Sequence, residues 1–135
     1  MNAMKYTSIT ENHLFHKAYT KGKRSVGKLV AVYVLPDFTA EKRMRANPKK
    51  EYINRLGISV SKKLGGAVVR SRVRRIVREG YRTACKNGTV KKGRLIVIAA
   101  RSASVNAKST EVGAELCHAF SELGLYSSKQ KQADV

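Results

Sequence analysis

The sequence has few acidic residues. Nine Asp and Glu side chains stand against 28 Lys and Arg side chains, which gives a formal net charge of +19 at pH 7. Like charges repel one another, so an excess of this size reports on binding partners and not on the stability of the fold. The usual partners of such a chain are polyanions, either nucleic acids or anionic membrane surfaces. The nine carboxylates are scattered, which argues against a paired-metal nuclease site.

Long hydrophobic runs are also missing. The longest apolar runs, 29–36 and 95–100, are far shorter than the roughly 20 residues that a membrane-spanning helix requires. Residues 1–10 contain no apolar stretch of the kind found in secretory signals. We therefore expect a cytoplasmic protein with no membrane partner.

The chain is nevertheless apolar enough to fold. Its 135 residues suit one domain, and a hydrophobic content of 42% excludes a disordered basic tail. We expect one domain over residues 1–135, with an ordered core at about 8–125 and a frayed tail at 127–135.

Catalytic and metal-binding motifs are absent from the sequence. Cys85 and Cys117 are single and widely spaced, and we expect both to be free thiols on helices. His13 and His16 have no carboxylate or thiol ligand placed with them, so we expect surface histidines. No phosphate-binding glycine motif is present either. We predict no catalytic residue, metal site or cofactor in this chain.

Apolar periodicity predicts an α+β protein with the element order α-β-β-α-β-α. A capping-box pattern at Ser8–Glu11 and an apolar face that follows it predict a first helix. In the first strand, Val30, Val32 and Val34 share one face, and Ala31, Tyr33 and Leu35 share the other. A last helix is expected to begin at a cap on Ser109 or Thr110 and to end before Gly124. The remaining expected elements are helices over about 8–21 and 67–85, strands over 29–35, 53–61 and 95–100, and a short extra strand near 25–26.

The helix expected at 67–85 carries the strongest functional signal. Arginines recur on it every turn, and the segment from Lys62 to Arg78 contains no acidic residue. The planar guanidinium fork can hold phosphate oxygens in bidentate fashion, and Gly65-Gly66 leaves backbone N–H groups accessible at the helix start. A solvated surface face normally mixes charges of both signs. The pattern therefore favours contact with nucleic acid.

Aromatic residues give a second, ambiguous signal. Phe15 and Tyr19 lie one turn apart on the first expected helix, and Tyr33 lies on a strand. Aromatic rings beside basic residues can stack on the bases of single-stranded RNA. The same rings can equally be core residues, and their spacing alone favours the core.

The segment 58–79, ISVSKKLGGAVVRSRVRRIVRE, closely resembles the signature V-S-K-K-x-G-N-A-V-x-R-N-R-x-K-R of the bacterial ribonuclease P protein component. The element order resembles that family over about residues 8–125. The resemblance implies a small protein partner of a catalytic RNA, with an α-β sandwich fold similar to domain 2 of ribosomal protein S5. It also implies a left-handed βαβ crossover.

The family resemblance implies roles for particular residues. An aromatic cleft that holds the 5′ leader of precursor tRNA corresponds here to Phe15, Tyr19 and Tyr33. Hydrolysis of the phosphodiester is then performed by water on Mg²⁺ ions held by the RNA subunit, and no obligatory protein partner is implied. The residues implied in contact with the catalytic RNA are Lys62, Lys63, Arg70, Ser71, Arg72, Arg74, Arg75 and Arg78.

The sequence departs from the family pattern at two asparagine positions, occupied here by Gly66 and Ser71, and in a longer basic connection at 37–51. A ribosomal protein or RNA chaperone would share the charge and size but would need no aromatic cleft. A membrane-surface helix at 67–85 is disfavoured, because that helix lacks a bulky apolar face.

Overall fold

The computed structural model describes residues 6–9, 12–36, 54–88, 90–91 and 93–126. The basic connection expected at 37–51 and the tail expected at 127–135 lie outside the described residues. The described elements, in chain order, are β1 (Tyr6–Ser8), α1 (Asn12–Lys21), β2 (Lys23–Val26), β3 (Val30–Pro36), β4 (Asn54–Ser59), the 3-10 helix η2 (Lys62–Leu64), α3 (Ala67–Asn87), β5 (Arg94–Ala100), the 3-10 helix η3 (Ser102–Asn106) and α4 (Ser109–Glu122).

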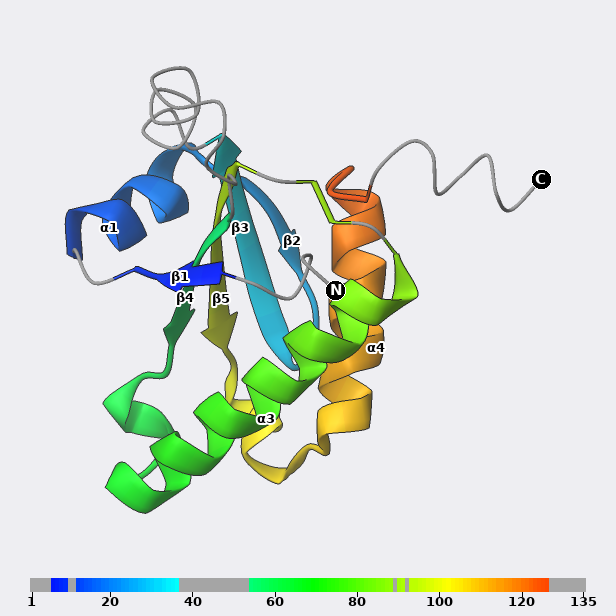
Figure 1. The fold of residues 1–135 in the computed structure, drawn as a ribbon. Coiled ribbons are helices and arrows are strands. Elements are labelled where there is room, and N and C mark those ends of the chain that lie inside the picture. Colours follow the sequence, from blue (N-terminus) through cyan, green and yellow to red (C-terminus); the bar gives the residue numbers. More distant parts are fainter. Residues whose placement is uncertain (1–5, 10–11, 37–53, 89, 92, 127–135) are drawn as a thin grey trace.

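The strands form one mixed sheet in the order β1-β4-β5-β3-β2. β4 pairs in parallel with both β1 and β5, whereas β3 pairs antiparallel with β5 and β2. Helix α3 connects the parallel strands β4 and β5. With α3 on the near side of the sheet in Figure 1, both strands run downward and β5 lies to the right of β4. The crossover is therefore left-handed, against the usual right-handed rule and as the family resemblance implied.

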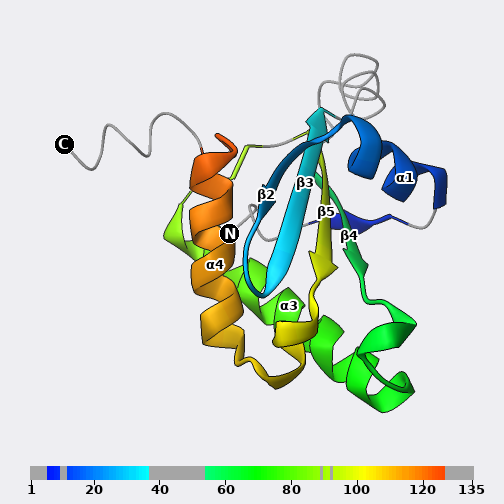
Figure 2. The ribbon, with the colours of Figure 1, turned by 180° about the vertical axis from the view of Figure 1, so that it is seen from behind.

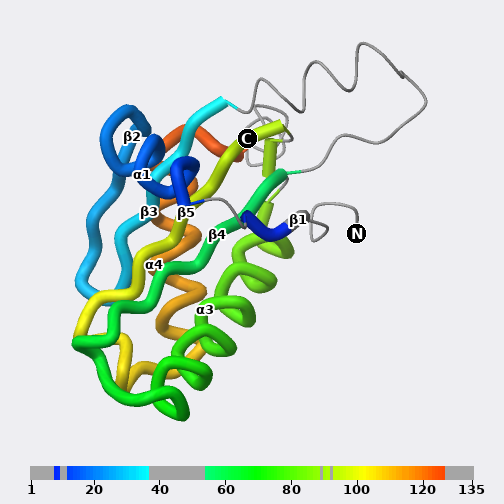
Figure 3. Tube along the Cα trace, turned by 90° about the vertical axis from the view of Figure 1, so that its left-hand side faces the viewer, coloured from blue at the N-terminus to red at the C-terminus, as the bar shows by residue number. Residues whose placement is uncertain are grey.

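The helices lie on both faces of the sheet. Helices α3 and α4 cover one face and α1 covers the other, an arrangement seen from behind in Figure 2 and from the α1 side in Figure 3. On β3, Val30, Val32 and Val34 pack into the larger core beneath α3 and α4. Tyr33 and Leu35 alternate with them and pack against the smaller core beneath α1. The two faces predicted for this strand are confirmed, and the fold is of the α+β class.

Helix α4 is fixed to the turn between β2 and β3 by carboxylates. Glu115 accepts the backbone N–H groups of Leu29 at 2.9 Å and Val30 at 2.7 Å. Two turns further on, Glu122 accepts the hydroxyl of the buried Ser25. Hydrogen bonds to a charged acceptor are stronger than neutral ones, so these contacts hold α4 at the outer edge of the sheet.

The N-terminal segment differs from the sequence prediction. The helix expected at 8–21 begins only at Asn12, and Ser8 is the last residue of strand β1. The backbone N–H of Ile9 donates to the carbonyl of Leu56 on β4, which continues this pairing. The capping box was therefore wrong as a helix start, since pairing with a distant strand claims Ser8. The cap expected at Ser109 or Thr110 was also wrong: the N-cap of α4 is Lys108, whose N–H donates to Glu111.

Close packing between α3 and α4 depends on glycine. A Cβ atom built on Gly80 would lie 2.8 Å from Cγ1 of Val112 and 3.0 Å from the backbone nitrogen of Gly113. One residue further along α3, the ring of Tyr81 meets that of Phe120 edge-on, with 6.0 Å between centroids. The two helices therefore approach each other as closely as backbone and side-chain atoms allow.

We expect Gly80→Ala to lower the free energy of unfolding by about 1–3 kcal/mol, because the added methyl group overpacks the contact between α3 and α4. Urea denaturation of both proteins measures the difference. Alanine normally favours a helix over glycine by about 1 kcal/mol. A variant more stable than the parent protein would show that the two helices do not approach so closely.

Candidate nucleic-acid interface

The start of α3 is built by a tight turn. The hydroxyl of Ser61 accepts the N–H of Lys63 at 3.2 Å, and the N–H of Gly65 donates to the carbonyl of Lys62 at 3.3 Å. Gly65 has a φ of 150°, which residues with a Cβ rarely adopt. The turn places the exposed Lys62 and Lys63 immediately before the helix. Both cations therefore lie near the positive end of the helix dipole.

Gly66 is the N-cap of α3 and makes no side-chain capping hydrogen bond. Its backbone is extended, with a φ of −74°, and a Cβ atom there would meet nothing within 4 Å. An asparagine, the family's commonest residue here, would fit without displacing any described atom. The open N–H groups at this helix start are available to solvent or to a bound anion.

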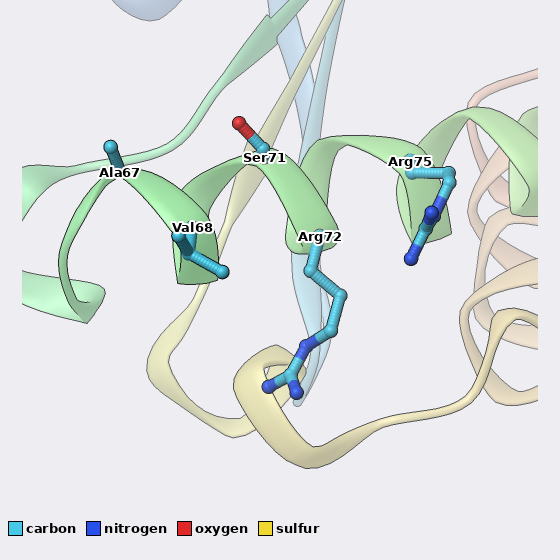
Figure 4. A pocket seen from close by; sticks show the side chains of 5 residues that line it. All are labelled: Ala67, Val68, Ser71, Arg72 and Arg75. Carbon is cyan, nitrogen blue, oxygen red and sulfur yellow. The ribbon is translucent and has the colours of Figure 1, made fainter.

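The arginines of α3 lie on two sides of the helix. Arg74 and Arg78 line a hollow of about 180 Å³ between α3, β4 and α1. Arg72 and Arg75 line a second, more open hollow of about 440 Å³ beside the first turns of α3 (Figure 4). Arg74 and Arg78, which recur one turn apart, therefore lie on one surface, and Arg72 and Arg75 lie on another. Arg70 and Arg74 are half-buried, whereas Arg72, Arg75 and Arg78 are exposed.

The smaller hollow brings together residues from both predicted groups. Phe15 of α1 was implied for leader binding, and Arg74 and Arg78 were implied for the RNA subunit. The ring of Phe15 lies over Gly57 of β4, where a Cβ atom would come within 2.7 Å of the ring. The remaining lining residues are Ser8, Ile9, Leu56 and Ile58. Gly57 was missed from the sequence, where nothing signals that this strand position lies beneath an aromatic ring.

The other two aromatics of the predicted cleft lie next to each other. The rings of Tyr19 and Tyr33 meet edge-on, with centroids 4.9 Å apart. Tyr19 is 36% exposed and Tyr33 is half-buried on the α1 side of the sheet. Phe15 lies one turn before Tyr19 on α1 and is also half-buried. All three rings therefore line one face of the sheet without being sealed inside the core.

The metal-ligating side chains of the described residues do not cluster. No group of three His, Cys, Asp or Glu side chains there could hold a metal ion. Both cysteines are free, and burial raises the pKa of the Cys85 thiol, which keeps it protonated at neutral pH. No described helix has the length and apolarity needed to cross a membrane.

Comparison with known proteins identifies the family. A family model described as Ribonuclease P matches residues 4–124. The chain belongs to the ribonuclease P protein family. It is 36% identical to the ribonuclease P protein component of Clostridium acetobutylicum, over 95% of this chain and 98% of that protein. It is 33% identical to that of Alkaliphilus oremlandii, over 89% of this chain and 93% of the relative.

Solved structures agree with this assignment. The RNase P protein of Staphylococcus aureus superposes with a TM-score of 0.68 and 26% identity, over 91% of this chain and 100% of that one. Membership of the ribonuclease P family places the chain in an endoribonuclease complex of tRNA processing. The family match over residues 4–124 includes all of the described helices and strands.

The N-cap of α3 can be tested with a pair of substitutions at one position. We expect Gly66→Asn to raise the free energy of unfolding by a few tenths of a kcal/mol and Gly66→Ala to lower it, a difference of about 1 kcal/mol between them. The space around Gly66 is open, so both differ from the parent mainly in capping. Denaturant titration of the three proteins should give free energies of unfolding that fall in the order Asn, Gly, Ala at position 66. Equal free energies would mean that capping at this position does not contribute to stability.

Proposed function

We propose that this chain is the protein subunit of a ribonuclease P ribonucleoprotein. In this proposal it binds the catalytic RNA and the 5′ leader of precursor tRNA, and it supports endonucleolytic removal of the leader to give the mature 5′ end. The observation that carries the proposal is the hollow in which Phe15 lies beside Arg74 and Arg78. An aromatic ring next to two guanidinium groups suits a single strand, which offers an unstacked base and a phosphate together.

The catalytic RNA is proposed to bind the exposed start of α3. Lys62 and Lys63 precede the helix, and Arg72 and Arg75 extend from its open side. None of the described carboxylates forms an ion pair with these arginines. Their charge is therefore available for phosphate groups, which arginine can hold in bidentate fashion. Arg70 and Ser71 complete this proposed surface, with Ser71 exposed at the place of a family asparagine.

The leader is proposed to lie between α1 and the sheet. Phe15 supplies a ring above Gly57, and Tyr19 and Tyr33 continue the aromatic surface. Arg74 and Arg78 flank the same hollow and would hold the phosphates of that strand. Mature tRNA lacks the leader, so this surface would separate substrate from product.

The chemical step is proposed to belong to the RNA subunit. The water that attacks the phosphodiester is then activated on Mg²⁺ held by RNA. The residue types of this chain support the assignment of the chemical step to the RNA. The hollow beside α3 is lined by cations and an aromatic ring, whereas a metal-dependent nuclease needs carboxylates. The protein contributes binding and orientation.

The phosphate contacts of α3 are tested by salt titration. For Arg72→Gln combined with Arg75→Gln, we expect the plot of log K against log salt, for binding to the catalytic RNA, to become shallower by about 0.9 per lost contact. The control is Lys23→Gln with Arg24→Gln, which removes two exposed charges from β2 at the far edge of the sheet. Equal slopes in the two double variants would refute specific contacts on α3.

The leader surface is tested in the reconstituted enzyme with precursor and mature tRNA. We expect Tyr33→Ala to weaken precursor binding by about 1–3 kcal/mol, the range for one base–aromatic stack, and to leave mature tRNA binding unchanged. Tyr33→Phe keeps the ring and should bind both like the parent. Melting temperatures check the fold of each variant. If Tyr33→Ala weakens both tRNAs equally or melts early, the ring serves the core and does not hold the leader.

A further inference from the structure

Val68 is an exposed apolar side chain inside a basic surface. It is 85% exposed, compared with 54% for Val26 and 36% for Tyr19, the other exposed large hydrophobic residues among those described. It lies in the first turn of α3, next to Ala67, which is also exposed. Burial of apolar surface is favourable, so a valine left in water at this position gains free energy when a partner covers it.

The surroundings of Val68 define the partner's chemistry. Val68, Arg72 and Arg75 extend from the same side of α3 and line the hollow of about 440 Å³, as Figure 4 shows. This volume lies within the range of about 300–1,000 Å³ typical of small-ligand sites. No carboxylate lines the hollow. The site therefore offers an apolar contact followed along the helix by two guanidinium groups.

One of the two arginines is held in place. An Nη atom of Arg72 donates to the carbonyl of Val105 in η3 at 2.8 Å, which ties the guanidinium to a second element. A guanidinium fixed in this way loses little side-chain entropy when a ligand stacks on it. Arg75, almost one turn further than Arg72 from the helix start, also lines the hollow. The hollow is thus partly formed before a ligand binds.

A nucleobase matches this combination better than a phosphate group does. A phosphate gains nothing from an apolar contact, whereas a base has a π-face that packs on valine and stacks on guanidinium planes. A base that is stacked and paired within a helix exposes no such face, so the ligand must be unpaired. The surrounding cations, among them Lys62 and Lys63, favour RNA over an acidic peptide because they extend well beyond the hollow.

We propose that this hollow seats one unpaired nucleobase of the catalytic RNA, with Val68 beneath the base and Arg72 and Arg75 at its sides. The inference rests on the proposed function, since it specifies how the RNA subunit contacts α3. It adds a contact whose strength does not depend on salt to a surface that otherwise binds by charge. Such a contact would fix the register of the protein along the RNA, which phosphate contacts alone leave free to slide.

The test compares Val68→Thr with Val26→Thr, which makes the same isosteric change at another exposed valine. Loss of one buried methyl contact should weaken binding of Val68→Thr to the full-length catalytic RNA about fourfold, with an unchanged salt slope. Val26→Thr should bind like the parent. Chemical modification of Watson–Crick edges should show one unpaired base protected by the parent protein and by Val26→Thr, and exposed with Val68→Thr.

The outcomes separate this inference from the proposed function. If Val68→Thr binds RNA like the parent, or if no base changes its reactivity, the base-binding site is wrong while the salt-dependent binding by α3 stands. If Val68→Thr changes the salt slope as an arginine variant does, the hollow holds phosphate instead. If an acidic peptide competes at the hollow and the RNA does not, the ligand is protein. If the parent protein does not bind the catalytic RNA, the proposed function itself fails.

Discussion

The functional surfaces depend on how α3 is anchored. All of its buried residues lie from Val73 onward, where Gly80 meets α4 and Tyr81 packs against Phe120. None of residues 67–72 is buried. The helix is therefore held firmly by its second half, while its first turns extend along the edge of the core. Only this arrangement leaves two sides of one helix open, so that arginines one or two positions apart in sequence can reach different ligands.

The left-handed crossover places α3 where its side chains line the same hollow as a side chain of α1. Because β4 lies between β1 and β5, the first half of α3 lies beside the outer strands of the sheet. Arg74 and Arg78 thus reach the hollow that also contains Phe15, although α1 and α3 cover opposite faces. The chirality that is unfavourable in most βαβ units here joins an aromatic surface to a cationic one.

Structural features that depend on neighbouring residues could be predicted from patterns in the sequence. Alternation along β3 predicted both of its faces, with Val30, Val32 and Val34 in the larger core and Tyr33 and Leu35 against the smaller one. Strand β1 escaped prediction because three residues carry too little pattern, and its pairing partner lies more than 40 residues away. The two hollows beside α3 escaped prediction for the same reason: a helical wheel shows which residues are neighbours but not which element lies opposite each side. The need for glycine at position 57 depends on Phe15, whose ring lies over this strand position although the residue is distant in sequence.

The described carboxylates make no ion pair with the arginines in the first half of α3. The described residues include four, and only Glu79 pairs with a cation, at 3.6 Å from the neighbouring Arg82. The other three lie on α4 and accept hydrogen bonds from Lys108, from Leu29 and Val30, and from Ser25. Acidic groups therefore hold α4 and the β2–β3 turn, where they satisfy backbone N–H groups. No described carboxylate forms an ion pair with the arginines in the first half of α3, which leaves their charge available for the phosphates of the proposed RNA partner.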